Sequence, residues 1–331
     1  MNGRESLIHA FLTRAGCGAA RREKLVGDAS FRRYERVFLD GETRILMDAP
    51  PPRENVLPFV KVATLLRDMG LTAPRVHASD PEHGLLLLED LGDMTLTRAL
   101  ALGHDERELY FLATDALIHL HRQAGQAEQA MLPAHDEERC LREVALVLDW
   151  YWPAALGEAP SPSLRDSFAE AWRAVLPHRY AVPSTIALFD FHIDNLMVIP
   201  EATGVAACGL LDFQDAVRAP LVFDLASLLE DVRRDVPQAL KQGVIAHYLR
   251  HFPSLSPDDF ALAYTVIAAQ RTVRIAGTFA RLLVRDGKPA YQSFMPRVWR
   301  LLAGQLTHPA LAPLDAWFTE HLPAEARRSL A

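Results

Sequence analysis

The order of apolar and polar residues predicts a strand-rich segment in the first ninety or so residues. The runs 31–39 and 43–47 are rich in β-branched and aromatic residues, and Asp40-Gly41 between them is typical of a tight hairpin turn. Over residues 58–69 the apolar positions recur at helical spacing. The apolar run 84–88 predicts a short buried strand. This part of the chain is therefore expected to form a small β-sheet with one main helix.

The pattern changes after about residue 95, where long segments of helical periodicity follow one another. Helices are predicted over residues 106–122, 138–151 and 257–285. They are interrupted between residues 183 and 216 by short apolar runs that border polar residues. The expected fold is α+β with two lobes, a small β-rich lobe over residues 1–91 and a larger helical lobe over residues 92–331.

Composition and charge narrow the class of protein. The chain has 331 residues, half of them hydrophobic, which suits two lobes with a sizeable core. The formal net charge of -7 leaves no excess of Lys and Arg for phosphates, so neither nucleic acid nor an anionic membrane is expected as a partner. No apolar run could span a bilayer, and residues 1–18 do not resemble a signal peptide. We therefore expect a cytoplasmic protein and favour a monomer.

The three cysteines do not indicate a disulfide framework or a zinc site. Cys17, Cys140 and Cys208 are odd in number and far apart in the sequence. We expect them to be reduced thiols inside the core.

Three polar side chains border the short apolar runs of residues 183–216. Asp190 follows the first run, Asn195 precedes the second, and Asp212 follows the third. Carboxylate and amide oxygens are the ligands that Mg²⁺ prefers, and a further carboxylate can orient an attacking hydroxyl group. An isolated aspartate at a strand end is more often a turn former or a helix cap. The combination of all three residues favours phosphoryl transfer.

This segment resembles the catalytic loop of the aminoglycoside phosphotransferase family, whose fold is related to that of protein kinases. The family pattern His-Gly-Asp-x-x-x-x-Asn, followed by a strand ending in a triplet such as Ile-Asp-Trp, matches at Asp190, Asn195 and Asp212. The resemblance implies that Asp190 is the catalytic base and that Asn195 and Asp212 bind the Mg²⁺ that accompanies ATP. Leu188 and Phe189 replace the His-Gly of the pattern. These two positions shape the loop, so activity is still expected.

Further matches extend the resemblance to nearly the whole chain. Residues 27–34 lie where the family positions the nucleotide, and residues 87–92 lie where the hinge between the lobes meets adenine. Candidate nucleotide contacts are Ser30, Phe31, Arg33, Glu89 and Leu91. The segment around Ser30 is equally typical of a simple β-turn. The element 224–226, Asp-Leu-Ala, resembles one that supports the catalytic loop.

The strand over residues 43–47 departs from protein kinases at one place. There the third strand supplies a lysine to the ATP phosphates, whereas this chain has Met47. The positive charge could come from Arg32, Arg33 or Lys61, or the nucleotide could be held without it. We expect it from Arg33, because this residue directly follows the predicted phosphate loop.

Within the family the chain resembles the anomeric N-acetylmuramate/N-acetylglucosamine kinases of bacterial cell-wall recycling. The similarity lies in residues 27–34, 47–50, 210–215 and 270–288. It implies transfer of the ATP γ-phosphate to the C1 hydroxyl group of a free amino sugar. N-acetylmuramate carries a carboxylate, which a guanidinium could bind. Candidate substrate contacts are Asp194, Arg271 and Arg274, for which a capping or solvated role is the simpler alternative.

Other interpretations of the same residues stay open. The acceptor could be an aminoglycoside, choline or a related compound, although such cations favour carboxylate-lined or aromatic-lined pockets. The missing strand lysine would also suit a nucleotide-binding pseudokinase with a regulatory role. A metal-dependent hydrolase would use the carboxylates but would leave the Ser30 segment and the hinge without a role. The sequence does not fix the anomer or the preference between the two amino sugars.

Overall fold

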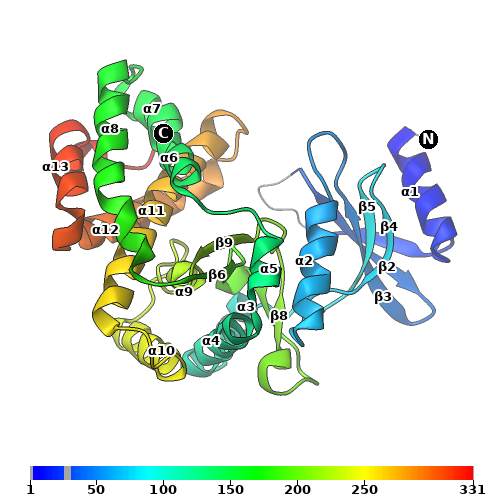
Figure 1. The fold of residues 1–331 in the computed structure, drawn as a ribbon. Coiled ribbons are helices and arrows are strands. Elements are labelled where there is room, and N and C mark those ends of the chain that lie inside the picture. Colours follow the sequence, from blue (N-terminus) through cyan, green and yellow to red (C-terminus); the bar gives the residue numbers. More distant parts are fainter. Residues whose placement is uncertain (1–2, 26–30, 331) are drawn as a thin grey trace. The chain divides into compact units, whose positions relative to one another are not determined.

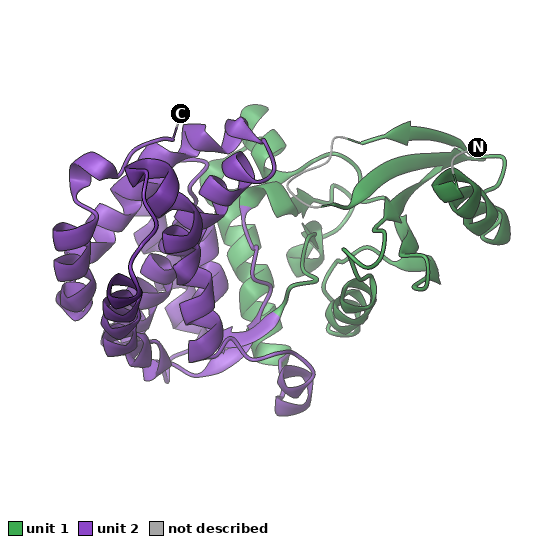
Figure 2. Ribbon diagram, turned by 90° about the horizontal axis from the view of Figure 1, so that it is seen from above, with its two compact units in different colours: residues 1–123, 193–216 green, residues 124–192, 217–331 purple. Residues whose placement is uncertain are grey.

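The computed structural model describes residues 3–25 and 31–330, and the chain divides into two compact units (Figure 1, Figure 2). The first unit comprises residues 1–123 and 193–216, and the second comprises residues 124–192 and 217–331. This division differs from the expected boundary after residue 91. The reason is that α4 (Glu106–Gln123) packs against η4 (Gly204–Ala207) and β8 (Cys208–Leu210) of the first unit.

The first unit contains the predicted β-sheet. Its five strands are antiparallel in the order β1-β2-β3-β5-β4. The strands are β1 (Arg21–Lys24), β2 (Arg33–Leu39), β3 (Glu42–Asp48), β4 (Val76–Asp80) and β5 (Leu85–Glu89). The predicted hairpin is confirmed, because Leu39 pairs with Glu42 across the turn. Asp40 and Gly41 have φ angles of 52° and 83°, the left-handed conformations of a two-residue turn of type I′.

A helix that the sequence analysis did not predict covers one face of this sheet. α1 (Gly3–Arg14) packs its residues Ile8, Phe11 and Leu12 against Val37, Leu46 and Leu87. Side chains alternate along a strand, so Arg33 lies on the face that α1 covers, together with Asp48. Tyr34 and Met47 lie on the opposite face.

The rest of the first unit is helical apart from one small hairpin. It consists of α2 (Leu57–Asp68), α3 (Leu96–Ala101), α4, η3 (Ile193–Asn195), β7 (Leu196–Val198), η4 and β8. Helix α2 confirms the prediction over residues 58–69, and α4 confirms the prediction over residues 106–122.

The second unit is a helical bundle around α11 (Pro257–Val284), a helix of 28 residues (Figure 1). Ser256 caps this helix by accepting a hydrogen bond from the Asp259 N–H, and Pro257 occupies its first turn, where no N–H is needed. The core around α11 includes Trp172, Val273 and Phe318.

Helices and short strands complete the second unit. The elements before α9 are α5 (Gln126–Ala130), α6 (Glu137–Leu146), the π-helical turn η1 (Val147–Tyr151), α7 (Trp152–Leu156), α8 (Pro162–Val175), η2 (Leu176–Ala181), β6 (Ser184–Ala187) and β9 (Val217–Pro220). The later ones are α9 (Phe223–Leu229), α10 (Gln238–His251), α11, η5 (Pro289–Phe294), α12 (Met295–Leu306), η6 (Pro309–Leu311), α13 (Ala312–His321) and η7 (Ala324–Ala326). Strands β6 and β9 form an antiparallel pair.

The structure bears on two further expectations from the sequence. Cys17, Cys140 and Cys208, all within the described residues, are buried and form no disulfide, as predicted. None of the helices in residues 3–25 and 31–330 is long and apolar enough to cross a bilayer.

Candidate active site

In the second unit, Asp190 follows a strained and well-supported turn after β6. The preceding residue Phe189 has a φ of 79°, a left-handed conformation that costs a non-glycine residue about 1–2 kcal/mol. This is the position at which the catalytic-loop pattern has glycine. The carboxylate of Asp224 accepts hydrogen bonds from the backbone N–H groups of Leu188, at 2.5 Å, and Phe189, at 3.0 Å. Asp224 therefore holds the loop in the shape that glycine would otherwise permit.

Asp224 is buried at the beginning of α9. Burial raises its pKa to about 7, although the two backbone N–H groups and the charge of Arg271 oppose this shift. The Phe189 ring stacks on Phe223, the residue before Asp224, with ring centres 5.4 Å apart. The polar and aromatic contacts together connect the catalytic loop to α9, as the sequence analysis expected for the element 224–226.

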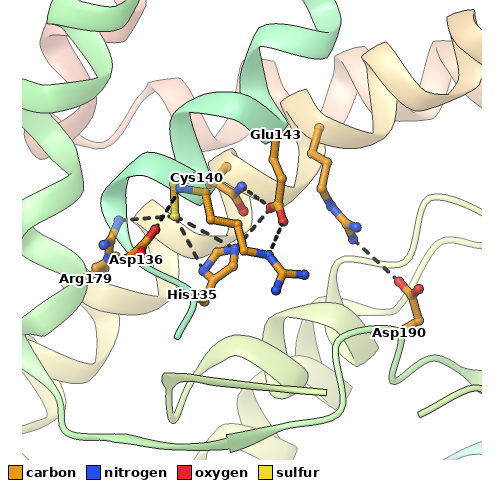
Figure 3. A network of polar contacts seen from close by, with 9 residues as sticks. His135, Asp136, Cys140, Glu143, Arg179 and Asp190 are labelled. Atoms are coloured by element: carbon orange, nitrogen blue, oxygen red, sulfur yellow. Dashed lines mark hydrogen bonds and ion pairs between the residues drawn. The ribbon is translucent and has the colours of Figure 1, made fainter. Parts of the chain in front are cut away.

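Two arginines of α11 lie close to this loop and differ in exposure. Arg274 places its Nη2 atom 3.5 Å from the Oδ1 atom of Asp190, and its guanidinium lies 4.2 Å from the centre of the Phe189 ring (Figure 3). No described residue accepts a hydrogen bond from its Nε atom. Arg271 is instead buried, where it donates to Ser227 Oγ at 2.5 Å. Of these two candidates, Arg274 is therefore the one that faces Asp190.

Figure 3 also shows a partly buried polar cluster around Glu143, and the charge of Arg274 acts on this carboxylate. Glu143 accepts hydrogen bonds from His135 Nε2 at 3.0 Å, Arg139 Nε at 2.9 Å and Gln270 Nε2 at 2.9 Å. Burial alone would raise the pKa of Glu143, but the hydrogen bonds from His135 and Arg139 and the charge of Arg274 lower it to about 2. Glu143 therefore stays ionised and helps to neutralise the arginines.

The sequence analysis did not find this cluster. His135 precedes α6, Glu143 lies on α6, and Gln270 and Arg274 lie on α11, so no spacing along the chain reveals their proximity.

In the first unit, a short hairpin brings the two predicted metal ligands together. Strands β7 and β8 pair in antiparallel register, with Leu196 opposite Leu210. Just beyond this pair, the Leu211 N–H donates to the Asn195 carbonyl oxygen at 2.9 Å. Asn195 and Asp212 therefore lie at the same end of the hairpin.

The carboxylate of Asp212 is positioned by basic and amide side chains. Its Oδ1 atom accepts hydrogen bonds from Arg32 Nη1 at 2.9 Å and from Gln214 Nε2 at 3.0 Å. Arg32 also donates to Glu54 at 3.1 Å. Burial opposes the shift, but the neighbouring Tyr34, Asp212 and Glu54 raise the pKa of Arg32, so its charge is retained.

An amide and a carboxylate at one hairpin end fit Mg²⁺, which favours hard oxygen ligands. Within the described part of the chain, no group of three or more His, Cys, Asp and Glu side chains could hold a metal ion. In kinases, Mg²⁺ takes one or two protein carboxylates together with phosphate oxygens. Asn195 and Asp212 are therefore the residues that would hold a metal arriving with a nucleotide.

The structure separates the two neighbouring arginines that were candidates for the phosphates. Arg33 is 63% exposed in its side chain and pairs with Asp48 Oδ2 at 2.8 Å. It does not reach Asp212, whereas Arg32 does. Met47 is buried in β3 and carries no charge, so a cation for the phosphates has to come from another residue.

The other predicted contacts have the following surroundings. Asp194 accepts a hydrogen bond from the Thr97 hydroxyl group on α3. Phe31 is exposed, and its N–H donates to Glu54. The Glu89 carboxylate accepts from the Arg75 N–H at 3.0 Å. The Leu91 side chain lies against Gly209, and Ser30 lies outside the described residues.

Comparison with known proteins defines the family. A model of the phosphotransferase enzyme family matches residues 22–257. The chain belongs to this family. Its members transfer a phosphoryl group, so the chain is a phosphotransferase with an alcohol group as acceptor. The sequence prediction of the family is confirmed.

Relatives of this phosphotransferase extend over almost its whole length. A protein of Caulobacter vibrioides named N-acetylmuramate/N-acetylglucosamine kinase is 36% identical over 98% of this chain and 98% of its own. A protein of the same name from Pseudomonas aeruginosa is 37% identical over 87% of this chain and 84% of its own.

Solved structures show that the phosphotransferase has the predicted fold. A choline/ethanolamine kinase family protein from Mesorhizobium loti superposes with a TM-score of 0.64 at 15% identity, covering 95% of this chain and 98% of the other. The GDP complex of wild-type aminoglycoside 2'-phosphotransferase-IIIa gives a TM-score of 0.61 at 14% identity, covering 92% and 99%. The protein-kinase-like α+β fold is thereby confirmed.

Proposed function

We propose that this phosphotransferase uses ATP and Mg²⁺ to phosphorylate the anomeric hydroxyl group of N-acetylmuramate, N-acetylglucosamine or both. One observation carries the proposal. The four relatives that are 32% to 37% identical over 87% to 98% of the chain all bear the name of a kinase of these two sugars. Identity at this level over most of the chain is more specific than a shared fold.

Each part of the reaction has a residue of suitable chemistry. Asp190 accepts a hydrogen bond from the sugar hydroxyl group and takes its proton as the bond to phosphorus forms and the bond to the ADP oxygen breaks. Asn195 and Asp212 would hold Mg²⁺, which offsets charge on the transferring phosphoryl group when bound. Transfer is direct, without a phosphoenzyme. Asp224 contributes indirectly because it keeps the turn before Asp190 in place.

The nucleotide contacts proposed from the family resemblance are Ser30, Phe31, Glu89 and Leu91. Adenine would meet the chain near the end of β5, and the phosphates would meet the segment that leads into β2. We place the reaction in the cytoplasm, where ATP is available, and in the reuse of cell-wall amino sugars. We favour a monomer.

The charges around Asp190 favour a neutral or acidic acceptor over a cationic one. Arg274 lies 3.5 Å from the Asp190 carboxylate and is 13% exposed in its side chain, so an incoming acceptor meets a positive group beside the base. Choline or an aminoglycoside would be repelled by this guanidinium. We propose that Arg274 binds the lactyl carboxylate of N-acetylmuramate, and that Arg271 supports it from the buried side of α11. Asp194 remains a second candidate for contact with the sugar.

A coupled assay of ADP release tests the function directly. With Mg-ATP as donor, we expect turnover with N-acetylmuramate and N-acetylglucosamine and none with kanamycin or choline. Sugars blocked at C1 as methyl glycosides should not react, because they lack the anomeric hydroxyl group. Nucleotide binding without sugar-stimulated ADP release would instead indicate a pseudokinase. Turnover with choline or kanamycin alone would assign a different acceptor.

Replacing Arg274 should change the choice between the two sugars. Because only N-acetylmuramate carries a carboxylate, Arg274→Gln should lower kcat/KM for this sugar about tenfold or more relative to N-acetylglucosamine. Arg274→Lys should recover part of the preference, since it retains the charge without the planar fork. Arg281→Gln, about two turns further along α11, serves as the matched control and should keep the wild-type ratio. An equal loss for both sugars would show that Arg274 acts on Asp190 and not on the substrate.

A further inference from the structure

We propose that Arg32, held in place by Glu54, is the cation that binds the ATP phosphates in this chain. The pair would take the place of the strand lysine and helix glutamate of protein kinases. This inference rests on the proposed use of ATP, and it names a residue that the sequence analysis mentioned only as an alternative to Arg33.

The alternation of side chains in the sheet decides between the two arginines. Tyr34 and Met47 are cross-strand partners on one face, and Arg33 and Asp48 are partners on the other, which α1 covers. Arg33 is directed to the α1 face, where Arg4 of α1 donates to Asp48 as well. A residue on that face cannot reach a ligand bound on the face of Met47.

Arg32 is the residue just before β2. Its guanidinium acts on the hydroxyl group of Tyr34, whose pKa is raised mainly by burial, and Tyr34 faces the same side of the sheet as Met47. The Arg32 side chain is 13% exposed, and its Nη1 atom lies 2.9 Å from Asp212 Oδ1. Magnesium held by Asp212 would bring phosphate oxygens to this carboxylate, and therefore within reach of Arg32.

Glu54 gives Arg32 a fixed orientation. Its Oε2 atom accepts from Arg32 Nε at 3.1 Å, and its Oε1 atom accepts from the Phe31 N–H at 3.2 Å. One carboxylate thus ties the guanidinium to the backbone just after the predicted phosphate loop. Binding through Nε turns the two Nη groups of Arg32 toward Asp212 and Asp215, which is the side where phosphates would lie. A guanidinium fork in this orientation suits bidentate contact with a phosphate.

Lys61 is the third candidate cation. It lies within α2, and its side chain is exposed. The contacts with Glu54 and Asp212 connect Arg32 to the predicted metal ligands.

The test measures nucleotide binding by calorimetry in the absence of sugar, so that an unexpected acceptor would not affect it. Arg32→Ala should weaken Mg-ATP and Mg-ADP about ten- to hundredfold, because a charge-assisted bond to phosphate is lost. Adenosine, which has no phosphate, should bind as to the wild type. Arg32→Lys should recover part of the affinity for Mg-ATP and Mg-ADP. Glu54→Gln should weaken both nucleotides less than Arg32→Ala does and should also leave adenosine binding unchanged. Arg33→Ala is the matched control and should leave all three affinities unchanged.

Several outcomes would overturn the proposal. Arg32→Ala with wild-type affinity for Mg-ATP would exclude the contact, and a loss confined to Arg33→Ala would return the role to Arg33. An equal loss for adenosine would show that Arg32 shapes the site without binding phosphate. Circular dichroism checks that Arg32→Ala is folded. If it is not, the nucleotide affinities of Arg32→Lys, which keeps the charge, decide whether Arg32 binds the phosphates. If the variants show the expected nucleotide affinities but no amino sugar is phosphorylated, only the proposed acceptor is refuted, and the role of Arg32 stands.

Discussion

Asp212→Asn should abolish phosphoryl transfer, with turnover reduced about a thousandfold or more, because electrostatic stabilisation supplies most of the catalysis in this reaction class. The substitution removes one negative charge and keeps the shape of the side chain. Asp212 has a φ of 54°, and asparagine tolerates this left-handed conformation as readily as aspartate does. The loss would therefore report on the metal ligand and not on a distorted backbone. Turnover is measured at saturating sugar and ATP over a range of Mg²⁺ concentrations.

Asp215→Asn is the matched control for this experiment. Asp215 lies on the same loop and is exposed, and its carboxylate accepts a hydrogen bond from Gln214 at 3.1 Å. Its replacement removes the same charge from the same segment and should leave turnover within about threefold of the wild type, because an exposed pair contributes little. Arg274→Ala should fall between the two. Similar, mild losses for Asp212→Asn and Arg274→Ala would contradict the assignment of Asp212 to the metal.

Local patterns were sufficient to predict α2, α4, α11 and the main hairpin. The hairpin at Asp40-Gly41 was predictable because two residues with positive φ are required there and this pair supplies them at low cost. The helix at residues 257–285 was predictable because Ser256 and Pro257 mark its start and its apolar periodicity continues over many turns. Helix α1 was missed, because its polar residues conceal the few apolar side chains that it buries.

The candidate site was less predictable than the fold. Motif spacing made Asp190, Asn195 and Asp212 the candidates, and each lies close to a short strand. The choice between Arg32 and Arg33 depended on the exact start of a strand, and a shift by one residue exchanges the two faces of a sheet. The bond between Arg32 and Asp212 joins residues that are 180 positions apart in the chain, which no local pattern reveals.

The catalytic loop illustrates how tertiary contacts can replace a local preference. Phe189 occupies a left-handed position where glycine is favoured. The sequence alone suggested only that the loop differs from the family pattern. The structure supplies the compensation, since Asp224 binds the two N–H groups at the turn and Phe223 stacks on the Phe189 ring. Such a departure is tolerated when the surroundings hold the unusual conformation.

Replacing Gly277 should have the largest effect on stability. This residue lies within α11, where a Cβ atom would come within 2.3 Å of the Leu146 carbonyl carbon and 2.5 Å of the Val147 backbone nitrogen. The contacting atoms belong to the backbone where α6 passes into the π-helical turn η1, so they cannot move aside like a flexible side chain. Gly277→Ala should lower the free energy of unfolding by about 3 kcal/mol, and Gly277→Val should prevent folding of the second unit.

Gly304→Ala is the matched control, because Gly304 lies within α12 and a Cβ atom there would have no neighbour within 4 Å. Alanine loses less backbone entropy in a helix than glycine does, so this variant should be more stable by up to about 1 kcal/mol. Tryptophan fluorescence during urea unfolding measures both variants. All five tryptophans of the chain lie in the second unit, so the signal reports on the unit that contains both glycines.

The two glycine-to-alanine changes should alter stability in opposite directions. The added methyl group meets backbone atoms in α11 but open space in α12. If Gly277→Ala were instead more stable than the wild type, α6 and α11 could move apart without loss of stability. The close contact between these helices at Gly277 would then not be needed to hold the bundle together.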